Sequence, residues 1–380
     1  MKKDPIIQSI LPELIDIRRK IHQNPELSWQ EFKTTELIKT VLEGWGLNFQ
    51  PFKTLKTGGY CDVGEGKTLV YRSDIDALPV MEDLDHAIRS QNKYIMHACG
   101  HDFHTAIGLG LLRYFQLSPV KNVFKLRVVF QPAEEAYPTG ADSVIKEDIL
   151  ENVKTILAAH VHCEIPIGKI GFSRGASNAS STSVQITFKG PGGHTSRPQE
   201  TIDLIPITAT FIYQIQKFLK EHINQNEIFV LAFGEIHGGN AHNVIPQVVT
   251  LKGTLRTFSP QTSERISELI RNLACQFENE KKCKITVEFP TNCPPVINNL
   301  KLCDQMIEFM RKNSTLDQLI ILPKPSMGAD DFSYYLTKAP GLYFYIGGGG
   351  KGKLHSGELE LDESLLEVAL NYLTGFIPII

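Results

Sequence analysis

Four short apolar runs, each followed directly by polar residues, constrain the fold of this chain more than any other feature. The runs cover residues 68–71, 126–130, 156–159 and 342–346, and they alternate with stretches of helical periodicity. Strands buried on both faces have this continuous apolar character, and alternation with helices is typical of a mostly parallel sheet. Ligands bind beyond the carboxyl ends of such strands. The sequence therefore predicts an α/β domain whose site lies where the polar residues follow the strands.

Helical periodicity is clearest at the two ends of the chain. Apolar residues recur every three or four positions over residues 6–21 and 32–45, and again over residues 300–312. Asn24-Pro25 ends the first stretch, and Gly46 stands where a helix-ending glycine is expected.

The pattern changes in the middle of the chain, where strand-like and helix-like segments follow in the order βαββαβ. That order is typical of a ferredoxin-like unit. The segments are residues 184–189, 202–221, 228–233, 248–258, 259–280 and 285–289. We therefore predict a discontinuous catalytic domain, residues 1–176 and 293–380, interrupted by a smaller domain, residues 177–292.

Charge and composition exclude several classes of protein. Lys plus Arg number 39 and Asp plus Glu number 42, for a net charge of −3, which gives no basic surface for nucleic acid or an anionic membrane. No apolar run approaches the roughly 20 residues of a membrane span, and the N-terminus lacks the apolar segment of a signal peptide. The seven cysteines are scattered, which does not fit a disulfide framework and indicates a reducing cytoplasm. We expect a small-molecule partner.

The motif MHACGHDFH, residues 96–104, holds the densest cluster of chemically active side chains. Cys99 and His101 flank a glycine, and thiolate and imidazole are good zinc ligands. A buried cysteine beside a helix-capping histidine is the alternative for this pair. Glu134 and Glu135 follow a predicted strand directly, and neighbouring side chains in extended backbone point to opposite sides. One carboxylate could then bind a metal while the other faces a water, although a solvated acidic loop remains an alternative.

Histidines after two further strands extend the set of donors. His160 and His162 end the run AAHVH, where both could point into a site or one could stop at its rim, and His355 follows a glycine-rich loop. A structural zinc has four ligands, whereas five donors with a bridging solvent suit two ions about 3.5–4 Å apart. In RSDIDALP, Asp74 and Asp76 could ligate metal, but we expect that Asp76 orients a ligating histidine.

These motifs resemble the M20 metallopeptidase family, specifically its amidohydrolase branch of N-acyl-amino-acid, hippurate, auxin-conjugate and N-acetyldiaminopimelate deacylases. The resemblance covers nearly the whole chain in order. It rests on IRRKIHQNPELSWQE, YRSDIDALPV, MHACGHDFH, FQPAEE, AHVH, GPGGHTSRP, GNAHNVIP, GTLRTFSP, MGADDF and LHSGELELDE. It implies a metal-dependent amidohydrolase that cleaves N-acyl amino acids to a carboxylic acid and a free amino acid.

The resemblance also implies roles for individual residues. Two divalent transition ions per chain, zinc or manganese with nickel or cobalt as alternatives, would be held by Cys99, His101, Glu135, His160 and His355. Glu134 would be the general base on a bridging water. His194 in the inserted lid would reach the scissile carbonyl, often from the partner of a homodimer. Asn243 and Arg256 match lid positions that hold the substrate carboxylate.

Three alternatives stay open on the sequence. A cysteine hydrolase would use Cys99 as nucleophile and His101 as base, but the other donors would then have no role. A catalytically dead, metal-binding dimer would need no base at Glu134. A narrower enzyme, an N-acetyldiaminopimelate deacetylase of lysine biosynthesis, would share all of these residues.

Overall fold

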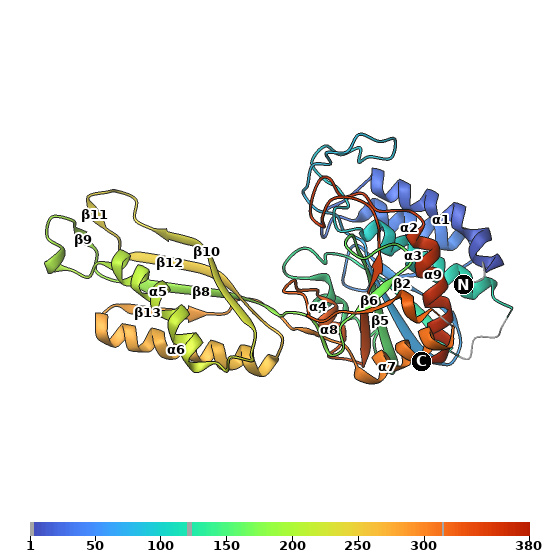
Figure 1. The fold of residues 1–380 in the computed structure, drawn as a ribbon. Helices are drawn as coiled ribbons and strands as arrows, with labels where there is room; N and C mark the ends of the chain where they lie inside the picture. Colours follow the sequence, from blue (N-terminus) through green and yellow to red (C-terminus); the bar gives the residue numbers. More distant parts are fainter. Residues whose placement is uncertain (1–3, 120–123, 314) are drawn as a thin grey trace. The chain divides into compact units, whose positions relative to one another are not determined.

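The computed structural model describes residues 4–119, 124–313 and 315–380, which form two compact units (Figure 1). The first unit comprises Met1–Ser177, Ile297–Pro325 and Asp331–Ile380, and the second comprises Asn178–Val296 and Ser326–Asp330. The sequence analysis placed residues 326–330 in the larger domain. The structure places them in the second unit, because the backbone N–H of Ala179 donates to the carbonyls of Ser326 and Gly328 at 2.9 and 3.0 Å.

The first unit is built around an eight-stranded sheet in the order β1-β2-β4-β3-β5-β17-β6-β16. Its centre is parallel: β3 pairs with β4 and β5, and β5 pairs with β17. The four apolar runs lie in these strands, which confirms the predicted mostly parallel sheet. Their bounds are β3 Lys67–Asp74, β4 Phe124–Gln131, β5 Val153–His162 and β17 Gly341–Gly347.

Helices at the two ends of the chain pack together against this sheet. α1 (Pro5–Gln23) contacts α3 (His101–Leu117), and both contact α9 (Leu365–Phe376). Asp4 caps α1 by accepting the backbone N–H groups of Ile6 and Ile7. α2 (Phe32–Gly44) ends as expected, with Gly46 in the left-handed region at a φ of +76°.

Shorter elements complete this part of the chain. The remaining strands are β1 Phe49–Pro51, β2 Gly59–Gly64, β6 Ile170–Phe172, β7 Ala176–Asn178, β15 Val296–Ile297 and β16 Leu319–Ile321. The remaining helices are α4 Gly140–Val144, α7 Leu300–Lys312, α8 Phe332–Tyr335 and the 3-10 turns Leu316–Gln318 and Ile377–Ile379.

The second unit is an antiparallel sheet, ordered β10-β12-β8-β13, packed against two helices. Alternate residues of β8 are buried among the apolar side chains of these helices, as a half-buried strand requires. The order along the chain is βαββαβ, as the periodicity predicts. The bounds are β8 Ser181–Lys189, α5 Leu204–His222, β10 Phe229–Gly238, β12 Val248–Thr257, α6 Pro260–Lys281 and β13 Lys284–Glu288, with β9 Gly193–His194, β11 Val244–Ile245, β14 Asn292–Cys293 and the 3-10 turn Pro198–Glu200 beside them.

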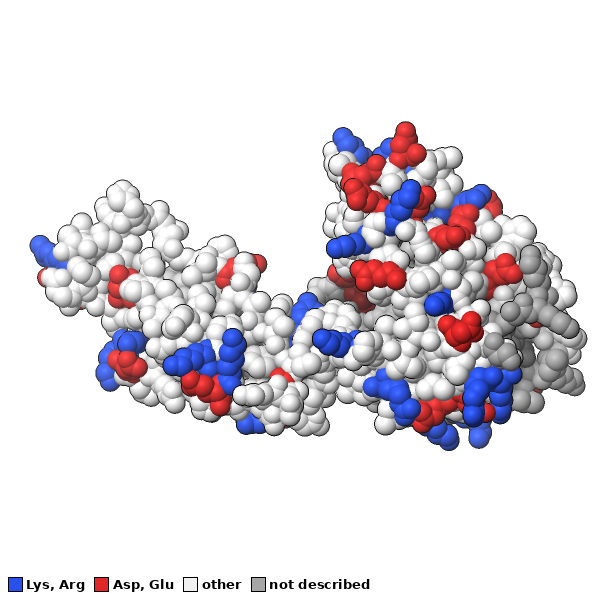
Figure 2. All heavy atoms as spheres, in the orientation of Figure 1, with Lys and Arg blue, Asp and Glu red and all other residues white. Residues whose placement is uncertain are grey.

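Two surface properties bear on possible partners. Among the described residues, no helix combines the length and the apolar character needed to cross a membrane. On the face shown in Figure 2, positive and negative side chains are interspersed, and neither sign forms a continuous patch. This face therefore offers no single-sign field for a polyanion.

Candidate metal centre

The turn before α3 places the first two predicted ligands beside the end of β5. Cys99 precedes Gly100, which has a φ of +82°, and α3 begins at His101. A Cβ atom at Gly100 would lie 2.4 Å from Cγ2 of Val161 in β5. Both the left-handed backbone and this close approach require glycine, so the motif fixes where the thiol and the imidazole lie.

His101 has one ring nitrogen engaged and the other turned to the site. Its Nδ1 lies 3.0 Å from the carbonyl oxygen and 3.2 Å from Oδ1 of Asp76, so Nδ1 carries the proton that is donated. Nε2 is buried and makes no hydrogen bond to the described residues. Burial lowers the pKa of His101, but Asp74 and Asp76 outweigh burial and raise it to about 10. A buried nitrogen surrounded by negative charge is a position suited to a cation.

Cys99 and His160 meet at the ends of their elements. Sγ of Cys99 lies 3.4 Å from Nε2 of His160, and Nδ1 of His160 donates to the carbonyl of Val161 at 2.7 Å. Burial, followed by the charges of Glu135 and Glu134, holds the pKa of the Cys99 thiol well above its usual range. Burial and then His104 hold the pKa of His160 well below its usual range. His160 is therefore neutral, with a lone pair on Nε2 that faces the thiol.

The two glutamates and His355 complete the cluster. Oε1 of Glu135 lies 3.1 Å from Nε2 of His355, and this contact raises the pKa of the histidine, with burial opposing it. Donor atoms lie within 4.8 Å of one another in three overlapping groups, which join all five predicted ligands and Glu134. These groups are Cys99–His101–His160, Cys99–Glu135–His355 and His101–Glu134–Glu135.

The backbone at the glutamates differs from the sequence argument. That argument assumed extended backbone, with Glu134 and Glu135 on opposite sides. β4 instead ends at Gln131, and the chain bends after Pro132 because Ala133 adopts a φ of +52°. The bend brings both carboxylates toward His101, so the premise was wrong although the pair does lie in the site.

Asp74 binds side chains that surround the donor cluster. Its carboxylate accepts from Arg72 and lies 2.5 Å from Nδ1 of His104, while Nε2 of His104 accepts the backbone N–H of Val161 at 2.9 Å. Both ring nitrogens of His104 are thereby used in contacts within the fold. Arg72 also binds Asp331 at 2.5 Å. The sequence analysis gave no role to Arg72, His104 or Asp331, although all three lie in quoted motifs.

His162 stands apart from the donors just described. Its Nδ1 accepts the backbone N–H of Glu164 at 3.2 Å, and its ring packs against that of Tyr345 with centroids 5.0 Å apart. Its side chain is only partly buried, which matches a residue at the rim.

The predicted substrate-binding residues belong to the second unit and fall into two groups. His194 and Asn243 lie together, because β9 pairs with β11 and the carbonyl of Asn243 accepts the N–H of Thr195 at 3.2 Å. Arg256 lies eight residues after Val248 along β12, a distance of about 26 Å at the usual rise per residue. Arg256 donates to the carbonyl of Met327 at 3.0 Å. One chain therefore does not bring Arg256 to the other two residues.

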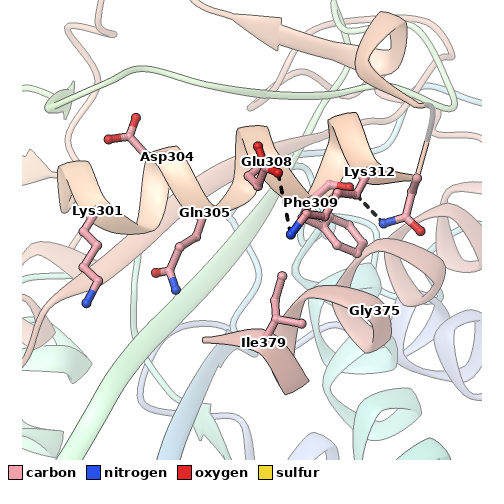
Figure 3. Close-up of a pocket in the computed structure, with 9 residues that line it drawn as sticks. Lys301, Asp304, Gln305, Glu308, Phe309, Lys312, Gly375 and Ile379 are labelled. Atoms are coloured by element: carbon pink, nitrogen blue, oxygen red, sulfur yellow. Dashed lines mark hydrogen bonds and ion pairs between the residues drawn. The ribbon is translucent and has the colours of Figure 1, made fainter.

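A large surface hollow lies elsewhere on the first unit, between α7 and the C-terminal residues (Figure 3). It measures about 940 Å³, and its charged groups pair locally, as in the contact of Lys312 with Glu308 at 3.6 Å. Its lining residues are Lys301, Asp304, Gln305, Glu308, Phe309, Lys312, Asn313, Gly375 and Ile379. It contains none of the predicted site residues, so its size alone does not make it the active site.

Cysteine, histidine and glutamate donors at the carboxyl ends of parallel strands, beside a further carboxylate, define a hydrolase site of the metal-binding kind. The chain belongs to peptidase family M20/M25/M40, whose family model matches residues 70–378. The predicted family and the predicted class of enzyme, a hydrolase of the M20 type, are thereby confirmed.

Individual proteins resemble the chain over almost their whole length. It is 33% identical to the N-acetyldiaminopimelate deacetylase of Bacillus subtilis (strain 168), over 97% of this chain and 99% of that one. It is 32% identical to the enzyme of the same name from Priestia megaterium, over 96% and 97%. Among solved structures, the YXEP protein of Bacillus subtilis, a dinuclear metal-binding peptidase from the M20 family, matches with a TM-score of 0.86, 30% identity and 98% coverage of both chains.

Proposed function

We propose that this protein is a metal-dependent amidohydrolase that cleaves N-acyl amino acids to a carboxylic acid and a free amino acid. The observation that carries the proposal is Nε2 of His101, a buried nitrogen without a hydrogen bond, which lies with Cys99 among donors from three other segments of the chain. A buried nitrogen without a hydrogen bond is costly, and this one faces Oδ2 of Asp74 at 3.6 Å, so it fits a ligand of a cation in such a cluster.

The donor set fits two divalent transition ions. A thiol and three imidazoles favour zinc, with manganese, nickel and cobalt as alternatives, over magnesium or calcium. The dinuclear relative from Bacillus subtilis supports the number two. Cys99, His101, Glu135, His160 and His355 would hold the ions. Ions bound there would polarise an amide carbonyl and lower the pKa of a water between them toward about 7.

The side chains would then perform the proton transfers. Glu134 would accept the proton of the attacking water and pass it to the leaving amine, a role that a carboxylate within 4.8 Å of the His101 and Glu135 donor atoms can perform. Asp76 would hold His101 in the tautomer that presents Nε2. His194 would donate to the developing oxyanion.

A homodimer would explain the divided set of lid residues. Arg256 lies about 26 Å along β12 from Val248, and the strand pair that carries His194 and Asn243 precedes that end of β12, so we infer that one substrate does not touch all three within one chain. If Arg256 grips the carboxylate of the substrate in one subunit, then His194 and Asn243 would come from its partner. The fork of arginine suits a carboxylate because it forms two parallel hydrogen bonds.

The structure gives the cysteine-hydrolase alternative little support. Cys99 lies 3.4 Å from Nε2 of His160, not in the simple pairing with His101 that this alternative assumes, and a cysteine hydrolase would give no role to the neighbouring donors Glu135 and His355. A location in the cytoplasm remains a prediction from the scattered cysteines.

The identity of the substrate has one specific candidate. The relatives from Bacillus subtilis and Priestia megaterium are named N-acetyldiaminopimelate deacetylases and match 97% and 96% of the chain. This favours an N-acetyl group and an amino acid with a second charged end as the first substrate to test.

A substrate panel tests the proposal. Metal-loaded protein is assayed with N-acetyldiaminopimelate, with N-acetyl and N-benzoyl amino acids, and with the amides of those amino acids. We expect release of free amino acid from at least one substrate that bears an α-carboxylate, and a much lower kcat/KM for its amide. Glu134→Gln, which lacks the proposed general base, is the inactive control. A metal-loaded protein that turns over none of these would contradict the proposal and favour a metal-binding dimer without activity.

A further inference from the structure

The bend that presents the two glutamates is held in an unfavourable backbone conformation. Ala133, directly before Glu134, has a φ of +52°, in the left-handed region where a Cβ atom is crowded by the backbone. Only glycine adopts this region without steric cost, so surrounding groups must hold an alanine there.

One buried carboxylate supplies this support from a distant part of the sequence. Glu31 is 0% exposed, and its Oε1 accepts the backbone N–H of Ala133 at 2.8 Å. The same oxygen accepts the N–H of Trp29 at 2.9 Å, and Oε2 accepts the hydroxyl of Thr57 at 2.8 Å. Trp29 is itself left-handed, with a φ of +67°. Glu31 thus binds the backbone of two strained residues.

A second carboxylate holds the other side of the bend. Oδ2 of Asp76 accepts the N–H of Glu135 at 3.0 Å and the hydroxyl of Ser28 at 2.7 Å. The carbonyl of Ala133 accepts the N–H of Gly140 at 2.8 Å. Pro132 has no N–H to contribute, so the Ala133 N–H is the donor through which the start of the bend is anchored to Glu31.

We propose that Glu31 is a positioning residue for the metal centre, which acts by holding the Ala133 N–H so that Glu134 and Glu135 point at the donor cluster. This inference rests on the proposed function in one respect, that Glu135 binds a metal ion. Glu31 touches neither the donor cluster nor a substrate in this role. Its effect passes through the geometry of the bend.

Burial and then the nearby Asp76 raise the pKa of Glu31 to about 7, because both disfavour the ionised carboxylate. Removal of the carboxylate leaves the N–H groups of Trp29 and Ala133 without their acceptor, so the stability of the unit is measured together with the site. Glutamine can keep an oxygen toward the two N–H groups and donate to the Thr57 hydroxyl, whereas methionine has a similar length and accepts neither N–H.

The test compares Glu31→Met with Glu31→Gln and with a matched control, Glu26→Met. Glu26 lies on the same segment and also accepts backbone N–H groups, but those of Lys33 and Thr34 at the start of α2. Competition between protein and a zinc indicator gives the Zn²⁺ affinity. Metal content, kcat, KM and unfolding by urea are measured on the same samples.

We expect Glu31→Met to lose about 10- to 100-fold in Zn²⁺ affinity, as outer groups that orient ligands typically do, and to lose kcat with little change in KM. Glu31→Gln should lose less than Glu31→Met, and Glu26→Met should bind Zn²⁺ like the wild type. Adding Ala133→Gly to Glu31→Met should restore part of the affinity, because glycine needs no support at this φ. A merely structural role would not give this rescue.

Wild-type affinity and kcat in folded Glu31→Met would overturn the inference while leaving the metal centre intact. Should Glu31→Met not fold, Thr57→Val removes only the hydroxyl donor to Glu31, and at least a threefold loss of Zn²⁺ affinity is expected; no loss would overturn the inference. Wild-type protein that binds no Zn²⁺ would instead refute the proposed function itself.

Discussion

A single buried carboxylate, Asp76, contacts two of the five proposed metal ligands. One of its oxygens lies 3.2 Å from Nδ1 of His101, and the other accepts the backbone N–H of Glu135. The orientation of an imidazole and that of a carboxylate ligand are therefore coupled through one side chain. At the scale of residues, the site depends on such outer contacts as much as on the donors themselves.

Substitutions at the adjacent glutamates should separate base from ligand. Glu134→Gln keeps the shape of the side chain but cannot accept a proton, so we expect it to retain about two metal ions per chain and to lose about 10²–10⁴-fold in kcat. Glu135→Gln should lose metal as well as activity. Elemental analysis and steady-state kinetics on both variants decide the assignment, and exchanged phenotypes would mean that the two roles are reversed.

The predicted donors do lie together, because each of them follows a strand or begins a helix at the same edge of the sheet. Glu31, Arg72 and His104 could not be assigned in the same way. Glu31 reaches Ala133 and Arg72 reaches Asp331 across long stretches of sequence, and no periodicity signals such contacts. The left-handed backbone at Ala133 could not be predicted either, because alanine rarely adopts a positive φ.

At the scale of elements, α1 is fixed to α3 by buried charges. Arg18 donates to Asp102 at 2.7 Å, and Nδ1 of His22 lies 2.9 Å from the same carboxylate oxygen, while Nε2 of His22 lies 3.3 Å from Glu82. Because Asp102 follows His101 in the first turn of α3, this network anchors the helix that begins at a proposed ligand. Removing one member would leave buried charge without its partner.

His22 should make the stability of the first unit depend on pH. Burial lowers the pKa of His22, but Asp102 and Glu82 outweigh burial and raise it. A raised folded-state pKa stabilises the fold fully below about pH 6.5, and this contribution is lost as the pH rises through the raised value. The wild type should therefore exceed His22→Gln in free energy of unfolding most at pH 5.5 and least at pH 9.

Tryptophan fluorescence during urea unfolding measures this difference in the first unit alone, because Trp29 and Trp45, the two tryptophans of the chain, both lie there. The range above pH 5.5 also avoids the titration of Asp102, whose pKa Arg18 and His22 hold well below its usual range against the effect of burial. A difference that stays constant or grows with pH would contradict the prediction.

Most long elements were predictable because they carry a strong period or a continuous apolar run, although α3 and α9 were given no span from the sequence. α7 and α6 match their predicted spans closely, and Ser259 caps α6 as its position before Pro260 indicates. The short edge strands, such as β1 and β16, have too few residues to show a pattern. β9 and β11 pair two residues each, so their contact could not be predicted from either segment alone.

At the scale of the whole molecule, His194 and Arg256 lie at separate points of the second unit, and the proposed homodimer rests on this separation. Chains that carry His194→Ala should be complemented by chains that carry Glu134→Gln. In each mixed dimer one site would combine an intact Glu134 with an intact His194 from the partner. Random exchange should then restore about a quarter of wild-type activity.

The readout is hydrolysis after the two inactive variants are mixed, unfolded and refolded together, with mass spectrometry to show that mixed dimers form. Mixed dimers that stay as inactive as their parents would show that each chain builds its site alone.

Removal and return of metal tests the central claim most directly. The protein is dialysed against a chelator until elemental analysis finds no metal, and is then assayed with the best substrate of the panel before and after Zn²⁺, Mn²⁺, Co²⁺ or Ni²⁺ is added. We expect that hydrolysis is abolished in the metal-free protein and restored by at least one of these ions, with about two bound per chain. Full turnover by protein shown to contain no metal would contradict the account.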